Sequence, residues 1–229
     1  MQTIQKFKKE IIKQVELGYL LSLPEAYEAT EEKKWPLILF FHGMGERGND
    51  VNKVKGEGIP KLAEYKDFPF IIVSPQCAKG ISWGKQTAEL RELLLKIIAE
   101  YNVDTSRIYL TGLSAGGSGA WKMACAYPKA FAAIAPICGG MADIYDMDDT
   151  DFEGLENIIN IPTWVFHGII DDIAPLAESV IIVEKLRALG GNVKATYYPG
   201  VGHDSWTITY DNPEFYEWLL SNVNNEFEL

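Results

Sequence analysis

The sequence predicts an α/β domain in which helices cover both faces of a mostly parallel sheet. Short β-branched or aromatic runs alternate with longer amphipathic segments, and this alternation is typical of parallel strands joined by crossover helices. The chain of 229 residues contains no internal repeat, Ser/Gly linker or low-complexity segment that would mark a second domain. We therefore expect residues 1–229 to form one domain.

Seven runs are the expected strands, and each is bounded by glycine or proline. These runs are residues 18–23, 37–41, 70–74, 107–111, 132–137, 163–166 and 194–198. Between the third and fourth runs, Leu90, Leu93, Leu94 and Ile97 recur at helical spacing, so residues 87–101 are the expected crossover helix. Further helices are expected at residues 118–126, 177–189 and 213–222.

The charge of the chain argues against two classes of partner. With 32 acidic and 21 basic side chains the net charge is -11, which repels phosphate backbones and anionic membranes. Neither nucleic acid nor a membrane is therefore an expected partner. The sequence carries no signal for the oligomeric state.

The cysteines and the N-terminus bear on the compartment. Cys77, Cys125 and Cys138 are an odd number in apolar surroundings, which favours buried reduced thiols over a disulfide framework. The N-terminus has no continuous apolar h-region or small-residue cleavage site, and no later stretch approaches the ~18 apolar residues of a membrane span. We expect a cytoplasmic protein.

Two glycine-rich motifs have the form of phosphate-binding loops. Residues 43–48, GMGERG, match GxGxxG, but the following NDVNKVKGEGIP has no helical stripe that would offer a helix N-terminus to a pyrophosphate. Residues 112–118 lack the lysine that contacts the β- and γ-phosphates in a phosphate loop. Nucleotide binding is not expected.

A third motif, GLSAG at residues 112–116, fits the pattern GxSxG. An expected strand runs directly into it and an expected helix follows, which is the context of a nucleophile elbow. In such an elbow the Ser114 hydroxyl stands clear of the sheet, and small residues two positions before and after it allow the close approach. The backbone N–H of Ala115 then points at the same space and can stabilise an oxyanion.

A serine nucleophile needs a histidine base, and the chain has three histidines. His203 lies in a loop after the last expected strand, so it fits the chain order serine, acid, histidine. His42 precedes the serine, and His167 has no suitable acid between it and Ser114. Both lie at strand ends, where we interpret them as structural residues.

The acid should follow the strand at residues 163–166 and precede His203. Asp171 and Asp172 are adjacent there, and adjacent loop residues point in different directions. Spacing alone leaves the choice between them open.

Four segments, HGMGERG, GLSAGG, HGIIDDIAP and GHDSW, resemble the α/β-hydrolase superfamily. Within it, the chain is similar to small esterases and predicted peptidases related to polyhydroxybutyrate depolymerases, feruloyl esterases and the catalytic domain of prolyl oligopeptidases. The resemblance covers nearly the whole chain and implies a mostly parallel sheet of roughly eight strands with helices on both faces.

The resemblance also implies roles for particular residues. The family pattern HGxxDxxVP carries the acid at its first aspartate, which is Asp171 here, with Ala174 in place of the usual valine. The HGMG loop implies that the backbone N–H of Met44 is the second oxyanion donor. Trp83 resembles an aromatic residue near the pocket of such enzymes, although an indole at this place can equally belong to the core.

No metal or cofactor is expected. Residues 149–160 partly match a calcium loop, but Asn160 stands where the bidentate glutamate belongs. No HExxH motif or clustered Cys/His spacing indicates zinc. We interpret residues 139–160, which are rich in aspartate, as an acidic excursion near the edge of the sheet.

The expected function is hydrolysis of carboxylic esters, short acyl or aryl, through a Ser-His-Asp acyl-enzyme mechanism. A small serine peptidase is the alternative of the same class. A non-catalytic, ligand-binding member of the fold is the alternative of another class.

Overall fold

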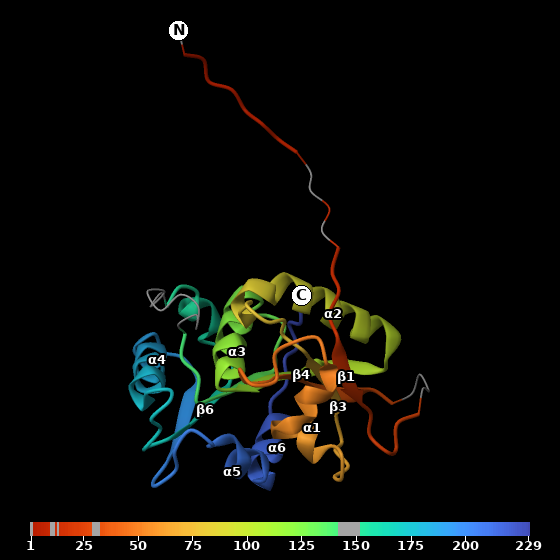
Figure 1. Ribbon diagram of the computed structural model, residues 1–229, viewed down its shortest axis with the longest axis vertical. Helices are drawn as coiled ribbons and strands as arrows, with labels where there is room; N and C mark the ends of the chain where they lie inside the picture. Colours follow the sequence, from red (N-terminus) through yellow and green to blue (C-terminus); the bar gives the residue numbers. More distant parts are fainter. Residues whose placement is uncertain (1, 10–11, 13, 29–32, 142–151) are drawn as a thin grey trace.

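A computed structural model describes residues 2–9, 12, 14–28, 33–141 and 152–229. Helices flank both faces of its central sheet (Figure 1). The sheet has the strand order β1-β3-β2-β4-β5-β6-β7, in which β1 is the antiparallel edge strand and the other strands are parallel. The mostly parallel sheet of the α/β-hydrolase fold is thus confirmed.

The seven strands of the described residues coincide with the seven apolar runs, against the roughly eight implied by the resemblance. Their bounds are β1 Tyr19–Ser22, β2 Trp35–Phe41, β3 Ile71–Pro75, β4 Val103–Leu113, β5 Ala133–Ile137, β6 Thr163–Gly168 and β7 Val193–Tyr198. The strand β4 is longer than expected at both ends. Its C-terminal extension carries the chain directly to Ser114.

The four expected helices are present, and two short ones were missed. The expected helices are α2 Thr87–Glu100, α3 Ala115–Ala126, α4 Leu176–Ala188 and α6 Pro213–Leu220. Helix α3 begins three residues earlier than expected, because its first turn contains the glycines that the sequence pattern attributes to the turn. Helices α1 Gly58–Leu62 and α5 Trp206–Tyr210 are too short for periodicity to reveal them.

Two apolar layers enclose the sheet. Along β2, Leu37, Leu39 and Phe41 face one layer, whereas Ile38 and Phe40 face the other. The first layer packs against α2, α3 and α4, and the second against α1, α5 and α6 (Figure 1). Burial on both faces holds the carboxyl ends of the strands in register, and the loops that follow these ends carry the site.

A 3-10 helix, Val51–Gly56, follows the GMGERG motif where the sequence showed no helical stripe. The side chain of Asp50 caps it by accepting a hydrogen bond from the Asn52 backbone N–H at 3.2 Å. A carboxylate therefore stands where a phosphate would bind, which gives a second reason against a nucleotide at this motif.

The middle of the acidic segment 139–160 lies outside the described residues, as does the start of the calcium-like loop. The described end of the segment departs from the expected solvated excursion. Leu155 and Ile158 lie in the short helix Leu155–Ile158 and are buried in the core. The apolar residues of this end thus contribute to the fold.

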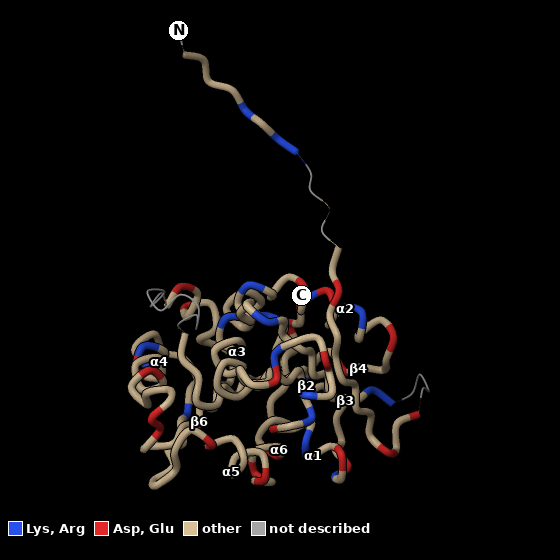
Figure 2. Tube along the Cα trace, in the orientation of Figure 1, with Lys and Arg blue, Asp and Glu red and all other residues tan. Residues whose placement is uncertain are grey.

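The charges and the cysteines are distributed over the fold as follows, and Cys125 is only partly buried, unlike the buried thiol expected. Acidic and basic positions are interspersed over the folded body (Figure 2). The three cysteines form no disulfide, and Cys77 and Cys138 are buried. Within the described part of the chain, we find no helix with both the length and the apolar character needed to cross a bilayer.

Candidate active site

The strand β4 turns into helix α3 at Ser114, whose backbone has φ 53° and ψ -120°. A Cβ on Gly112 would lie 2.4 Å from the Gly116 carbonyl oxygen, and a Cβ on Gly116 would lie 2.1 Å from the Phe41 carbonyl oxygen. Both contacts are with backbone atoms, so neither position tolerates a side chain without displacing the chain. The expected nucleophile elbow is present, with its serine in a strained conformation.

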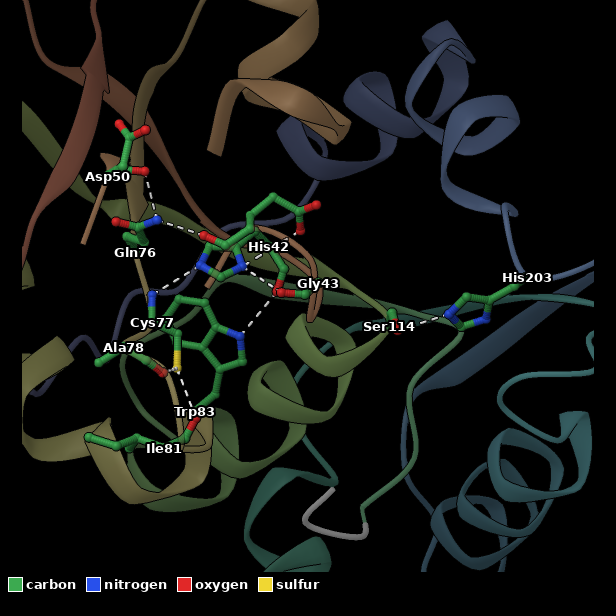
Figure 3. A network of polar contacts seen from close by, with 11 residues as sticks. His42, Gly43, Asp50, Gln76, Cys77, Ala78, Ile81, Trp83, Ser114 and His203 are labelled. Carbon is green, nitrogen blue, oxygen red and sulfur yellow. Dashed lines mark hydrogen bonds and ion pairs between the residues drawn. The ribbon is translucent and has the colours of Figure 1, made fainter. Parts of the chain in front are cut away.

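His203 lies in the loop between β7 and α5 and bridges the two other predicted residues. The Ser114 hydroxyl donates to His203 Nε2 at 2.9 Å, and His203 Nδ1–H donates to Asp171 Oδ2 at 2.7 Å. The Ser114–His203 contact is at the right of Figure 3. The imidazole is 18% exposed, whereas the Asp171 side chain is fully buried. This arrangement can pass the serine proton to the imidazole and stabilise the resulting imidazolium.

Asp171, rather than its neighbour, faces the histidine. Its other oxygen, Oδ1, accepts the backbone N–H groups of Ile173 and Ala174, both at 2.9 Å. Burial alone raises the pKa of Asp171, but the hydrogen bonds from His203, Ala174 and Ile173 outweigh it and hold the pKa below the usual value. Asp172 is exposed. The geometry thus separates two residues that spacing could not.

Asp171 has a second histidine neighbour, His167, which the sequence did not predict. His167, at the end of β6, is fully buried, and its Nε2 lies 3.1 Å from Asp171 Oδ2. The same nitrogen donates to the Ala174 carbonyl at 2.9 Å, while Nδ1 contacts the Ser179 hydroxyl at 2.8 Å. One feature of the sequence could have indicated this contact: Asp171 follows His167 by four residues, and the turn between them starts with Gly168.

Two backbone amides are candidates for the oxyanion hole. Ala115 is the first residue of α3, where a backbone N–H has no acceptor within the helix. The loop that contains Met44 lies against the elbow, since a Cβ on Gly43 would be 2.9 Å from Leu113 Cδ1. The Met44 side chain is largely exposed. Ala115 thus adjoins Ser114 directly, and the loop of Met44 packs against Leu113, the residue before Ser114.

The His42 side chain contacts the main chain of this loop at Gly43 (Figure 3). Its Nδ1–H donates to the Gly43 carbonyl at 2.6 Å, and its Nε2 accepts the Cys77 backbone N–H at 3.0 Å. One nitrogen donates and the other accepts, so the ring is neutral. Burial lowers the pKa of His42 to about 4, which agrees with this assignment.

Trp83 lies behind the same loop and not at the mouth of the site. Its ring stacks on Phe41 with centroids 4.4 Å apart, and its Nε1–H donates to the His42 carbonyl at 3.1 Å. The residue is 2% exposed, which leaves almost no surface for a substrate. Of the two readings of this indole that the sequence allowed, the geometry favours the core.

Cys138, Asp171 and His203 bring three potential metal-ligand atoms within 4.8 Å of one another. Cys138 is buried and has a positive φ of 41°. Burial raises the pKa of its thiol to about 12, so the sulfur stays protonated at neutral pH. A metal requires the thiolate, and Asp171 and His203 are already hydrogen-bonded to each other and His203 to Ser114, so this group fits a metal poorly.

A family profile described as phospholipase/carboxylesterase matches residues 68–211, well over half of the chain and the part that holds Ser114, Asp171 and His203. The chain belongs to the phospholipase/carboxylesterase family. The strand arrangement and the elbow described above are consistent with this membership.

Curated relatives of this family member include proteins named feruloyl esterases and one named a depolymerase. The probable feruloyl esterase C of Aspergillus terreus is 27% identical over 176 residues, which span 73% of this chain and 59% of that protein. The probable feruloyl esterase C of Aspergillus oryzae is also 27% identical, over 82% of this chain and 67% of that protein. The poly(3-hydroxyalkanoate) depolymerase C of Paucimonas lemoignei is 40% identical over 120 residues, 46% of this chain and 28% of that protein. The chain thus covers only part of the length of these relatives.

Solved structures agree on the fold. A thermostable esterase aligns with a TM-score of 0.75 and 33% identity, over 91% of this chain and 60% of that chain. The acylaminoacyl peptidase of Pyrococcus horikoshii aligns with a TM-score of 0.63 at 18% identity, over 95% of this chain and 43% of that chain. The second likeness bears on the fold alone.

Proposed function

We propose that the protein hydrolyses carboxylic esters through an acyl-enzyme on Ser114. The observation that carries this proposal is the His203 imidazole, which contacts the Ser114 hydroxyl with one nitrogen and the Asp171 carboxylate with the other. Family membership and the esterase names of the relatives support the same class of reaction.

The mechanism follows from these contacts. Ser114 Oγ attacks the acyl carbonyl while His203 Nε2 takes its proton, and the imidazolium then protonates the leaving alcohol. Water attacks the acyl-enzyme with the same histidine as base, which releases the acid and restores the serine. Asp171 holds Nδ1–H and stabilises the imidazolium.

We assign the oxyanion hole to the backbone N–H groups of Ala115 and Met44. Each donor should lower the barrier by about 3 kcal/mol. We assign Trp83 a supporting role, because it holds the His42 carbonyl at the base of the Met44 loop. No resident metal or cofactor takes part in this mechanism.

The proposed substrates are short acyl or aryl esters of the feruloyl type. The names of the Aspergillus relatives support the aryl choice, and the chemistry of an alcohol leaving group supports esters in general. A small serine peptidase is the alternative, because a Ser-His-Asp arrangement can also cleave amide bonds. The three free cysteines, which form no disulfide, are consistent with the proposed reducing, cytoplasmic location.

The test is a substrate panel with the wild type and Ser114→Ala. The panel holds p-nitrophenyl esters from acetate to octanoate, methyl ferulate and a chromogenic peptide, and a fluorophosphonate probe reports the nucleophile. Ester hydrolysis that disappears in the variant supports the proposal. Cleavage of the peptide alone would support the peptidase, and a wild type that neither hydrolyses nor reacts with the probe would indicate a non-catalytic protein.

A further inference from the structure

The buried acid of the triad lies between two histidines. Asp171 Oδ2 is 2.7 Å from His203 Nδ1 on one side and 3.1 Å from His167 Nε2 on the other. The side chains of Asp171 and His167 are both fully buried. A buried carboxylate is held in the folded state only if its oxygens are satisfied, so each contact around it matters for its position.

The hydrogen-bond partners of His167 fix which nitrogen carries the proton. The Ala174 carbonyl can only accept, so Nε2 must donate to it across their 2.9 Å contact. In the neutral ring, Nδ1 is then the acceptor, and the Ser179 hydroxyl donates to it at 2.8 Å. The Ala174 carbonyl therefore sets the tautomer, and Ser179, which lies on α4 and is fully buried, holds the other side of the ring. The result is an Nε2–H that donates to the Ala174 carbonyl while the same nitrogen lies 3.1 Å from Asp171 Oδ2.

The same N–H connects the acid and the loop that surrounds it. His167 Nε2 donates to the Ala174 carbonyl, and the Ala174 backbone N–H donates to Asp171 Oδ1 at 2.9 Å. His167, Ala174 and Asp171 thus form a closed ring of contacts in which the imidazole touches both the loop and the carboxylate. A shift of the imidazole would move Asp171 directly and through Ala174.

We propose that His167 is a positioning residue that holds the Asp171 carboxylate in the orientation that His203 requires, with its own ring held in place by Ser179 and the Ala174 carbonyl. The inference rests on the proposed function, because it assigns His167 a role through the triad. His167 touches neither the nucleophile nor, in this geometry, a substrate, so its effect is on the rate of the chemical step and not on binding. Sub-ångström placement of such a group can change the rate about a hundredfold.

A matched pair of substitutions tests this role. In His167→Gln the side-chain amide nitrogen reaches the place of Nε2 and keeps the donor, whereas the shorter side chain of His167→Asn does not reach it. For p-nitrophenyl acetate we expect His167→Asn to lower kcat about tenfold to a hundredfold with KM changed less than about twofold. On a logarithmic scale, we expect the kcat of His167→Gln to lie at least halfway from the kcat of His167→Asn to that of the wild type.

The controls separate this role from general damage to the fold. Thermal unfolding and near-ultraviolet circular dichroism show whether each variant is folded, and the downfield proton signal of the His203–Asp171 hydrogen bond should weaken in His167→Asn. Equal impairment of the Asn and Gln variants, or an unchanged kcat in folded His167→Asn, would overturn the proposal. If both variants fail to fold, Ser179→Ala decides: an unchanged kcat in that variant overturns it, and a lowered kcat at constant KM supports it.

Labelling with the fluorophosphonate distinguishes this inference from the proposed function. A wild type that is not labelled at Ser114 contradicts the esterase itself. A wild type that is labelled, together with His167→Asn that is labelled at the same rate, contradicts only the role of His167.

Discussion

A His-Gly pair lies at the carboxyl ends of both β2 and β6: His42 and Gly43 follow β2, and His167 and Gly168 are the last residues of β6. Both histidine rings are buried. Each ring donates to a carbonyl of its own loop, His42 to Gly43 and His167 to Ala174. The remaining nitrogens differ, because His42 accepts a backbone N–H from Cys77 and His167 accepts the Ser179 hydroxyl. The hydrogen bonds of the first ring are thus with main chain alone, whereas the second ring bonds a side chain and lies 3.1 Å from the carboxylate of the proposed catalytic acid.

This difference teaches how one local pattern can support two parts of a reaction centre. A strand end followed by His-Gly supplies a buried ring with one donor and one acceptor. The role of each ring depends on which other residues the loop after it brings into contact with the ring. Substitutions on each side can separate the two roles.

The largest expected effect is on the acid side. Asp171→Asn should keep the geometry but present the wrong hydrogen-bonding pattern to His203 Nδ1, so we expect kcat for p-nitrophenyl acetate to fall about 10⁴-fold. Asp172→Asn is the matched control, because its exposed side chain has no such contact. Steady-state kinetics of both variants check this. If the two variants lose activity equally, Asp171 is not the acid.

On the oxyanion side the expected effect is on stability below neutral pH. The folded pKa of His42 is about 4, below the ordinary value of 6.5, so the unfolded chain binds a proton near pH 5 that the folded chain does not. Stability is therefore lost as the pH falls from about 6.5 toward 4. Between pH 7.5 and pH 5, His42 should lower the free energy of unfolding by about 2 kcal/mol.

The variant His42→Gln provides the comparison for this measurement. Its side chain does not titrate, so urea unfolding at the two pH values should show a loss smaller than that of the wild type by about the same 2 kcal/mol. Two charged groups act on the ring: the Glu46 carboxylate lies 3.7 Å from His42 Nδ1, with its pKa raised by burial, and the charge of Arg47 helps to lower the pKa of His42. Equal losses in wild type and variant would show that His42 is not held neutral by the fold.

The smallest expected effect concerns Trp83. Trp83→Phe keeps the stacking on Phe41 but removes the N–H that holds the His42 carbonyl, which should cost about 1 kcal/mol and lower kcat severalfold through the Met44 loop. The measurement is kcat and KM for p-nitrophenyl acetate and methyl ferulate. An increase in KM with unchanged kcat would instead restore the substrate-contact role that the sequence had suggested for this indole.

Much of the fold and the site could be predicted because short-range patterns determine them. The seven apolar runs became strands, and the elbow at Ser114 follows from glycines that steric contact requires. The choice between Asp171 and Asp172 needed either the family resemblance or the geometry, since both residues share the same loop. Helices α1 and α5 were missed because five residues cannot show a helical period.

The contacts of His167 and Trp83 could not be predicted from the pattern, because each depends on residues brought close by the sheet. Ser179 lies twelve residues after His167, and His42 lies forty-one residues before Trp83. Nothing in the local sequence around either residue specifies these partners. Both pairs form only when helices pack against strand ends.

The order of the strands has a consequence for the newly made protein. The proposed nucleophile, Ser114, follows β4 near the centre of the sheet, the proposed acid, Asp171, follows β6, and the proposed base, His203, follows β7 at the edge. A chain that has left the ribosome only as far as β6 would present a serine and an aspartate without an imidazole between them. Reactivity would therefore begin only when the outermost strand is in place, which protects unfinished chains from acylation.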